Sequence, residues 1–452
     1  MNFFQIKKNN KRMPESVMRK ITCMGIATFL IACLIYLIPQ LNILLTTHGD
    51  GWLLRKEFIL FSGVVAWLFM TLAMVLSLRL SALESMTGGL DKGFILHKWA
   101  GIITLTTGVL HWMMKIIPKW LAQQGWIIPQ QKTRHMAGTA PEWPVELAAV
   151  GQTIAEWAIY VLIILCVISL SKKVPYHLFR YIHKIFPLIY LSMTFHTLTI
   201  LAKTSWWAGP SSMIILTLAA IGTVSAFISL FQLIGKKRKI SATVIRAERH
   251  GDTIDITLQS EKPLHYRSGQ FAFVRFGNNA EQHPYTIASS PVSPLTLRFV
   301  IKALGDDTRH LVETLTPGVK AEVEGPYGCF DFECRLERQI WVAGGIGITP
   351  FLSRLTALAQ QGGTETPTEL WYCGRQEPSR ELTELCSKAK VRLHTVDTRN
   401  HERLSSETLL QAMSPDEKVG VWFCGPASFG HILHRDMKKR AVPFQYDNFS
   451  LR

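Results

Sequence analysis

The stretch FILHKWAGIITLTTGVLHWMMKI, residues 94–116, decides the fold, because it is apolar, long enough to cross a bilayer, and still holds two histidines. His97 and His111 are 14 residues apart, which is roughly 21 Å along a helix. A second pair, His183 and His196, is 13 residues apart, roughly 20 Å, around another apolar run. Ionisable side chains are rare at membrane depth, where they mark a pathway or a cofactor. The two pairs predict two metal ions stacked between two membrane helices.

Apolar runs recur through the first half of the chain, at 21–40, 57–80, 94–116, 153–171, 185–202 and 207–234. Each approaches or exceeds the roughly 20 residues that a membrane helix needs. A basic segment precedes the first run, but no small-residue cleavage site follows it, so we expect a retained helix and not a signal peptide. The first half is therefore predicted to be a bundle of six membrane helices.

The chain carries a formal net charge of +16, and the position of the basic residues argues against nucleic acid as a partner. They gather in the N-terminal tail, in 171–180 and in 235–239, at alternate ends of the expected helices. By the positive-inside rule the N-terminus and the second half of the chain face the cytoplasm. We expect an inner (plasma) membrane protein whose partner is the lipid bilayer. Basic residues on the expected outer side, namely Arg55, Lys56, Lys115 and Lys119, dilute this pattern without reversing it.

The eight cysteines lie in the apolar runs or in the second half, and none forms a CxxC pair. A disulfide framework, a zinc site or an iron–sulfur site is therefore not expected, in keeping with a reducing compartment.

The expected topology pairs the histidines across two helices, His97 with His183 on the inner side and His111 with His196 on the outer side. A 14-residue step returns a helical side chain to within roughly 40°, whereas a 13-residue step leaves it about 140° away. Pro187 lies between His183 and His196, and we expect it to kink or retune that helix. His177 is a weaker candidate, because 19 residues from His196 corresponds to roughly 29 Å. For any single histidine, an ordinary buried and hydrogen-bonded imidazole is the alternative.

The second half begins with short alternating strands between about 240 and 337, which predict a small antiparallel β-barrel. Within it stands His283-Pro284-Tyr285-Thr286. A tyrosine ring followed by a hydroxyl group suits a flavin, because the ring stacks on the isoalloxazine and the hydroxyl bonds its edge.

After Arg338 buried strands alternate with helices, the rhythm of a parallel α/β sheet. Strand 339–343 runs into a glycine-rich loop and then a helix, a context that favours pyrophosphate binding at the helix N-terminus. The loop residues expected at the nucleotide are Gly344, Gly345, Gly347, Thr349 and Pro350.

Two further strand ends complete this expected site, at 371–375 and 422–426, because ligands of open α/β sheets bind beyond the carboxyl ends of strands. Arg375 and Arg380 are candidates for a 2′-phosphate, which would favour NADPH, and surface arginines are the equal alternative, so NADH stays open.

The segment from His97 to Trp112, with Tyr181-Ile182-His183 and Phe195-His196, resembles the transmembrane domain of the ferric reductase and NADPH oxidase superfamily. Gly269-Gln270-Phe271, the 283–290 segment and Glu324-Gly325-Pro326-Tyr327-Gly328 resemble the FAD domain of the ferredoxin reductase family. Most members of that family have arginine where this chain has His283, and the histidine form is similar to the oxidase and ferric reductase branch.

The resemblance implies a six-helix transmembrane haem-binding bundle followed by a β-barrel FAD domain and an α/β Rossmann-like NAD(P) domain. The expected divisions are 1–20 for a tail, 21–235, 236–337 and 338–452. The implied cofactors are two haem b groups, FAD, and NADPH or NADH. The residues that carry the resemblance and the expected cofactor contacts are His97, His111, His183 and His196 for iron, His283, Pro284, Tyr285, Thr286, Lys302 and Gly325 for FAD, and Cys424, Gly425 and Phe449 beside the nicotinamide and flavin.

Tyr285, Thr286, Cys424 and Phe449 are the residues we expect next to the reacting rings, with Phe449 covering the flavin. For both Lys302 and Phe449, an ordinary solvated or core residue is the alternative.

The resemblance implies a transmembrane enzyme that passes electrons from NAD(P)H through FAD and two haems to an external acceptor. Oxygen reduced to superoxide leads as the acceptor, with a ferric chelate, a quinone or a periplasmic redox protein as alternatives. A haem-containing sensory or partner-docking protein is the competing class. No obligatory protein partner is evident in the sequence.

Overall fold

The computed structural model describes residues 15–46, 51–128, 143–171, 173–277, 281–333, 336–375, 377–400, 403–414 and 417–447. The chain forms two compact units, of which the first contains Arg19–Leu83 and Lys92–Ile234. The second contains Gly235–Arg452 together with the short segment Glu84–Asp91.

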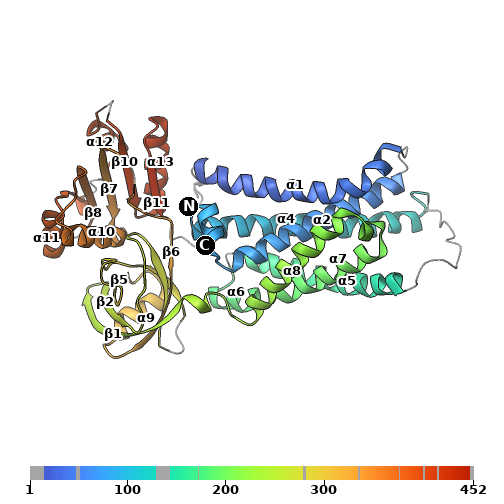
Figure 1. Ribbon diagram of the computed structural model, residues 1–452, viewed down its shortest axis with the longest axis horizontal. Helices are drawn as coiled ribbons and strands as arrows, with labels where there is room; N and C mark the ends of the chain where they lie inside the picture. The colour runs from blue at the N-terminus through green and yellow to red at the C-terminus, as the bar shows by residue number, and fades with distance from the viewer. Residues whose placement is uncertain are drawn as a thin grey trace, which may run out of the picture. The chain divides into compact units, whose positions relative to one another are not determined.

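The first unit is built from long apolar helices that lie side by side (Figure 1). They are α1 (Glu15–Thr46), α2 (Gly51–Ser77), α4 (Leu90–Gln123), α5 (Trp143–Leu170), α7 (Phe186–Lys203) and α8 (Pro210–Leu230), with the short α3 (Ser81–Thr87) and α6 (Tyr176–His183) between them. Six segments are long and apolar enough to cross a membrane, among the described residues. The predicted bundle of six membrane helices is confirmed.

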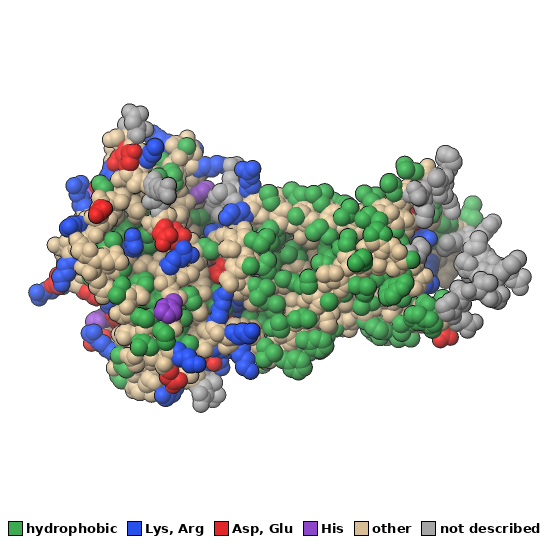
Figure 2. All heavy atoms as spheres, in the orientation of Figure 1, with side chains coloured by type: hydrophobic (Ala, Val, Ile, Leu, Met, Phe, Trp, Pro, Cys, Tyr) green, Lys and Arg blue, Asp and Glu red, His purple; other side chains and the backbone are tan. Residues whose placement is uncertain are grey.

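The outer surface of this unit is covered with hydrophobic side chains on the face seen in Figure 2. Trp157 on α5 is 72% exposed, and Met213 on α8 is 73% exposed. Large apolar side chains turned outward in such numbers suit lipid and not water. The chain is a multi-pass membrane protein.

The fifth apolar segment is divided and not one straight helix. α6 ends at His183, a turn at 184–185 follows, and α7 begins at Phe186 with Pro187 in its first turn. Pro187 has no N–H to donate to the carbonyl of His183, so the helical hydrogen-bond ladder cannot continue through this point. The predicted effect of Pro187 is thus found as a break between two helices, and His183 and His196 lie on different helices.

The first domain of the second unit is an antiparallel sheet in the order β4-β3-β6-β1-β2-β5. The strands are β1 (Lys239–His250), β2 (Thr253–Ser260), β3 (Phe271–Phe276), β4 (His283–Thr286), β5 (Thr296–Lys302) and β6 (Lys320–Tyr327), with η2 (Lys236–Arg238) before them and α9 (Asp306–Thr314) after β5. Beyond β4 the chain continues toward β5 at the other edge of the sheet, where the amide of Ala288 donates to the carbonyl of Arg298 at 2.8 Å. The sheet therefore closes nearly into a barrel around apolar side chains such as Ile256, Phe299 and Val323.

The second domain of this unit is a parallel sheet in the order β11-β10-β7-β8-β9. Its strands are β7 (Arg338–Gly344), β8 (Thr368–Gly374), β9 (Arg392–Asp397), β10 (Val419–Cys424) and β11 (Phe444–Asp447). The helical segments around it are η3 (Gly345–Ile348), α10 (Thr349–Gln360), α11 (Arg380–Lys388), η4 (Thr398–Asn400), α12 (Ser406–Gln411) and α13 (Ala427–Lys439). The chain order reverses at β7, between β8 on one side and β10 on the other, which places the ligand crevice at the carboxyl ends of β7 and β10.

Barrel and parallel sheet are joined by hydrogen bonds just beyond β4. The hydroxyl of Ser353 on α10 donates to the carbonyl of Ser289 at 2.6 Å, and the hydroxyl of Ser290 donates to Gln360 on α10 at 2.7 Å. The segment that continues from the Tyr285-Thr286 strand is therefore fixed on the helix that follows the glycine-rich loop. The predicted barrel and α/β domain are both confirmed.

Candidate functional site

The histidines of α4 are held by the backbone of α2. Nδ1 of His97 lies 2.9 Å from the carbonyl oxygen of Ala73, and Nδ1 of His111 lies 2.8 Å from that of Ile59. A carbonyl only accepts, so Nδ1 is the protonated nitrogen of both rings and Nε2 carries the free lone pair. The acceptors Ala73 and Ile59 are themselves 14 residues apart, as are the two histidines. Two antiparallel helices thus orient both rings in the same way.

His183 and His196, the expected partners of these two rings, have surroundings that differ from one another. The ring centroid of His183 lies 5.8 Å from that of His97, and Nδ1 of His183 lies 3.3 Å from the hydroxyl of Ser169 on α5. The two imidazoles are thus neighbours, tilted by 55° to one another. His196 is on α7, and its Nδ1 is buried without a hydrogen-bond partner among the described residues.

Two glycines allow the helices to approach the histidines His111 and His196. A Cβ added to Gly63 of α2 would lie 3.0 Å from the ring of His111. A Cβ added to Gly151 of α5 would collide with the hydroxyl oxygen of Thr199 and lie 3.4 Å from the Cα of His196. The positions opposite these two histidines therefore accept no side chain without a shift of their neighbours.

The Tyr285-Thr286 pair ends β4, which is paired with β3. Thr286 is buried, and Tyr285 packs against the barrel core. Burial raises the pKa of the Tyr285 phenol, and the negative charge of Asp307 raises it further. The phenol is therefore a neutral hydrogen-bonding group.

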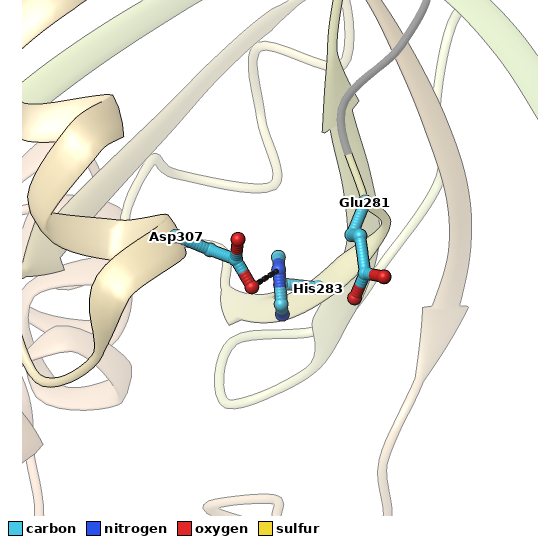
Figure 3. A group of neighbouring side chains, drawn as sticks. All are labelled: Glu281, His283 and Asp307. Carbon is cyan, nitrogen blue, oxygen red and sulfur yellow. Dashed lines mark ion pairs between the residues drawn. The ribbon is translucent and has the colours of Figure 1, made fainter. Parts of the chain in front are cut away.

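At the start of the same strand, His283 lies between two carboxylates (Figure 3). The ligand atoms of Glu281, His283 and Asp307 all lie within 4.8 Å of one another, and Nε2 of His283 is 3.5 Å from the nearer oxygen of Asp307. Asp307 is in the first turn of α9, where the helix dipole favours negative charge. His283 and the N-terminus of α9 thus come together at one edge of the barrel.

The remaining flavin candidates have structural contacts of their own. Pro284 lies within β4, opposite Phe273. Gly325 of β6 packs on Ala272 of β3, the residue paired with Tyr285, with 3.1 Å between an added Cβ and that of Ala272. Lys302 ends β5, where its ammonium lies 3.1 Å from the carboxylate of Asp252.

The glycine-rich loop lies at the end of β7 against the end of β10. Gly344 ends β7, Gly345 and Gly347 lie in η3, and Thr349 and Pro350 begin α10. A Cβ added to Gly347 would collide with the carbonyl oxygen of Cys424 and lie 2.8 Å from the amide nitrogen of Gly425. The structure therefore brings the loop and the Cys424-Gly425 turn together, at the sheet's switch point.

Some predicted residues lie elsewhere or outside the described part. Arg375 is exposed after β8, and Arg380 forms an exposed ion pair with Glu384 of its own helix. Cys424 is buried, with 3% of its surface exposed. Phe449 falls outside the described residues, as does the side chain of His177.

Sequence reasoning missed the groups that orient the histidines, because most of them are backbone atoms. The carbonyls of Ala73 and Ile59 leave no mark in residue type. A signal was present in Gly63, a glycine inside an apolar membrane helix, which commonly marks close helix packing.

Three family models match successive parts of the chain. Residues 62–194 match the ferric reductase like transmembrane component, residues 236–331 an FAD-binding domain, and residues 341–434 an oxidoreductase NAD-binding domain. With the fold and the clustered residues, these matches define a membrane-bound oxidoreductase with FAD and NAD(P)H domains. The chain thus carries, in order, a ferric reductase like transmembrane component, an FAD-binding domain and an oxidoreductase NAD-binding domain.

Its relatives include both NADPH oxidases and ferric reduction oxidases. A superoxide-generating NADPH oxidase heavy chain of Dictyostelium discoideum is 25% identical over 386 residues, covering 75% of this chain and 71% of the relative. Ferric reduction oxidase 4 of Arabidopsis thaliana is 26% identical over 212 residues, covering 45% of this chain but only 28% of the relative. Among solved structures, an Amycolatopsis cytochrome P450 reductase matches 47% of this chain and 70% of its own with 19% identity and a TM-score of 0.41.

Proposed function

We propose that this chain carries electrons from cytoplasmic NAD(P)H across the membrane, through FAD and two haem b groups, to an acceptor outside. When bound, FAD takes two electrons from a hydride and the haems pass them on singly. The nucleotide binds at the Gly347 and Cys424-Gly425 turns, and the flavin lies along Tyr285 and Thr286. His283 and the N-terminus of α9 bind the flavin phosphates, a role to which Lys302 contributes if it leaves Asp252.

The observation that carries the proposal is the matched orientation of two histidines in a membrane helix. His97 and His111 each use Nδ1 on a carbonyl of α2, at 2.9 and 2.8 Å, which leaves Nε2 for a metal. Such outer hydrogen bonds are what fix metal-ligating imidazoles in proteins. We assign His183 as the second ligand beside His97, and His196 as the second ligand beside His111.

The membrane orientation follows from charge. Basic residues at 171–180 and 235–239 favour a cytoplasmic location for the end of the helical unit that leads into the FAD domain. Export of an electron from an inside-negative cell is then favourable, by roughly 2.3 kcal/mol per 100 mV.

Oxygen is the acceptor that we favour. If His111 and His196 both bind the outer haem iron, they would leave no position for the acceptor on the metal, and electron transfer would go to a molecule that does not bind it. The relative from Dictyostelium, which this chain covers for the greater part, is named as superoxide-generating. The second candidate is a ferric chelate, which the name of the Arabidopsis ferric reduction oxidase 4 favours.

The test uses full-length protein in sealed vesicles, with NADPH or NADH on the side of the FAD domain and the acceptor on the other side. Superoxide dismutase-sensitive reduction of cytochrome c supports the oxidase, and ferric-chelate reduction that survives without oxygen supports the reductase. His111→Leu is expected to stop both reactions while NAD(P)H still reduces the flavin. Full transmembrane activity in that variant would refute the route.

A further inference from the structure

The helical unit has a buried polar cluster that the histidines do not explain. It lies at the end of the unit where α1 ends and α2 begins, which we name the distal end. The hydroxyl of Tyr36 on α1 donates to Oε2 of Glu57 on α2 at 3.0 Å. Gln40 follows one helical turn after Tyr36 on the same side of α1. Glu57 and Gln40 are each only 4% exposed.

Two oxygens of this cluster lack a hydrogen-bond donor. Oε1 of Glu57 and Oε1 of Gln40 are both buried and have no partner among the described residues. Aromatic rings surround the cluster, since the Tyr36 ring lies 5.2 Å from that of Phe61 and 6.2 Å from that of Trp206. An ionised carboxylate in such a place costs several kcal/mol unless something compensates its charge.

The charged groups of neighbouring elements do not supply that compensation. No cation in the described part of the chain forms an ion pair with Glu57. The guanidinium of Arg55 donates to the carbonyls of Met114 and Lys115 on α4, and the Lys115 ammonium pairs with Glu156 of α5. The other titratable groups toward this end are Tyr36 on α1, Lys56 on α2, His111 and Lys119 on α4, Glu146 on α5, and His196 and Lys203 on α7, while η1 (Ser205–Ala208) and α8 contribute none.

We propose that the Tyr36–Gln40–Glu57 cluster is a proton-binding site, and that Glu57 exchanges a proton with the distal side when an electron reaches the His111–His196 pair. A carboxylate only accepts hydrogen bonds, whereas a protonated carboxyl also donates one. A proton on Oε1 of Glu57 turns a partnerless acceptor into a donor and removes the buried negative charge.

The link to the histidines runs through α2 and rests on the proposed function. Glu57 and Ile59 are two residues apart, and the carbonyl of Ile59 holds the ring of His111. In this turn of α2, the Glu57 carboxyl thus lies on the side of α1, and the Ile59 carbonyl that contacts His111 lies on the side of α4. An electron arriving beside His111 adds negative charge, and uptake of one proton at Glu57 balances it; the proton leaves again when the electron does.

The test measures purified full-length protein in lipid nanodiscs. Infrared difference spectra between the reduced and oxidised states are expected to contain a carboxylic acid C=O band that shifts in D₂O. The midpoint potential of the distal haem is expected to fall as pH rises, by up to about 59 mV per pH unit for one proton per electron. Glu57→Gln is expected to lose the band and flatten this slope, whereas Glu57→Asp keeps both.

Glu146→Gln is the matched control, because Glu146 is an exposed carboxylate in the first turn of α5 at the same end. It is expected to leave the band and the slope unchanged. The proton site would be overturned if Glu57→Gln gave the same spectrum and the same slope as the wild type. It would also be overturned if the wild type lacked the band, which is the result expected for a carboxylate solvated by water or by a metal cation. The number of haems per chain is measured first. Fewer than two haems would contradict the proposed function and this site with it. Two haems together with an unchanged response in Glu57→Gln would contradict the site alone.

Discussion

The hydrogen bonds that orient His97 and His111 are accepted by main-chain atoms of α2, so they do not depend on the identity of residues 73 and 59. Each ring gives its Nδ1 proton to a carbonyl that has a free lone pair in addition to its helical bond. The ring cannot turn without losing that bond inside an apolar environment, where an unpaired N–H is costly. The backbone carbonyls of Ala73 and Ile59 thus fix the rings of His97 and His111.

Gly63 offers a test at this scale. Gly63→Leu is expected to displace the ring of His111, because even a Cβ at residue 63 would lie 3.0 Å from it. The haem content should fall from two per chain toward one, measured by haem extraction against protein. Gly101→Leu on α4 is the control, since an added Cβ there meets nothing within 4 Å. Equal haem content in both variants would contradict the packing argument.

Two buried thiols give a prediction about pH. Burial raises the pKa of Cys373 to about 12 and that of Cys386 to about 12. Both thiols therefore stay neutral between pH 7 and 9, and since the thiolate is the nucleophile, alkylation of the native protein should stay slow across this range. Mass spectrometry after iodoacetamide treatment checks this, with denatured protein as the control in which both cysteines react. Rapid, pH-dependent labelling of the native protein would show that the thiols are accessible.

At the scale of elements, the break between α6 and α7 resolves the conflict that the 13-residue spacing creates. On one ideal helix, His183 and His196 would point about 140° apart. His183 ends α6 and His196 lies on α7, so the angle of an ideal helix does not apply across the turn at 184–185. Proline at the start of α7 is compatible with a helix because its missing N–H would be unpaired there in any case.

Pro187→Ala is expected to weaken this break. Alanine restores the N–H that can bond to the carbonyl of His183, so α6 and α7 can join and turn His183 away from His97. Haem content should fall from two per chain toward one, and optical spectra should show the loss at the inner pair. Pro210→Ala is the control, because Pro210 also begins a helix, α8, but has no histidine to orient. Two haems with unchanged spectra in Pro187→Ala would mean that the break does not depend on proline.

Much of the fold was predictable from the sequence, because length, hydropathy and strand period are local properties. The six membrane helices, the barrel and the α/β domain all follow from such patterns. The contact of Gly63 with His111 and that of the Asp307 carboxylate with His283 were not predictable, since they depend on which helices and strands become neighbours, although a glycine inside an apolar helix was itself a signal of close packing. Pro187 was recognisable as a perturbation, but only the structure shows that it takes the form of a turn at 184–185 between α6 and α7.

For the molecule as a whole, the FAD barrel and the NAD domain have to keep one arrangement while electrons pass between them. Arg298 on β5 contributes to this, because its guanidinium bonds both Asp255 of the barrel and Glu381 on α11 of the NAD domain, the latter at 2.8 Å from Nη2. These two carboxylates raise the pKa of Arg298, against the effect of burial, so the guanidinium stays charged. Arg298 therefore joins the two domains.

Glu381→Gln is expected to slow reduction of the flavin by NADPH about fivefold, since a partly exposed ion pair contributes roughly 1 kcal/mol. The effect should shrink at high salt, which already screens the pair in the wild type. Stopped-flow absorbance of the flavin measures the rate. Glu384→Gln on the same helix is the control, because Glu384 pairs only with the exposed Arg380 as far as the described residues show. Equal rates in both variants at low salt would remove the proposed role of Arg298.

The central claim is that two pairs of membrane histidines hold two haems between FAD and the outside. Its most direct test is the number and ligation of haems in the purified full-length chain, by haem extraction against protein and by electron paramagnetic resonance. The account predicts two low-spin, bis-histidine haems in the wild type, and one each in His97→Leu and His111→Leu. A wild type with one haem or none, or a high-spin signal in place of the low-spin pair, would contradict it.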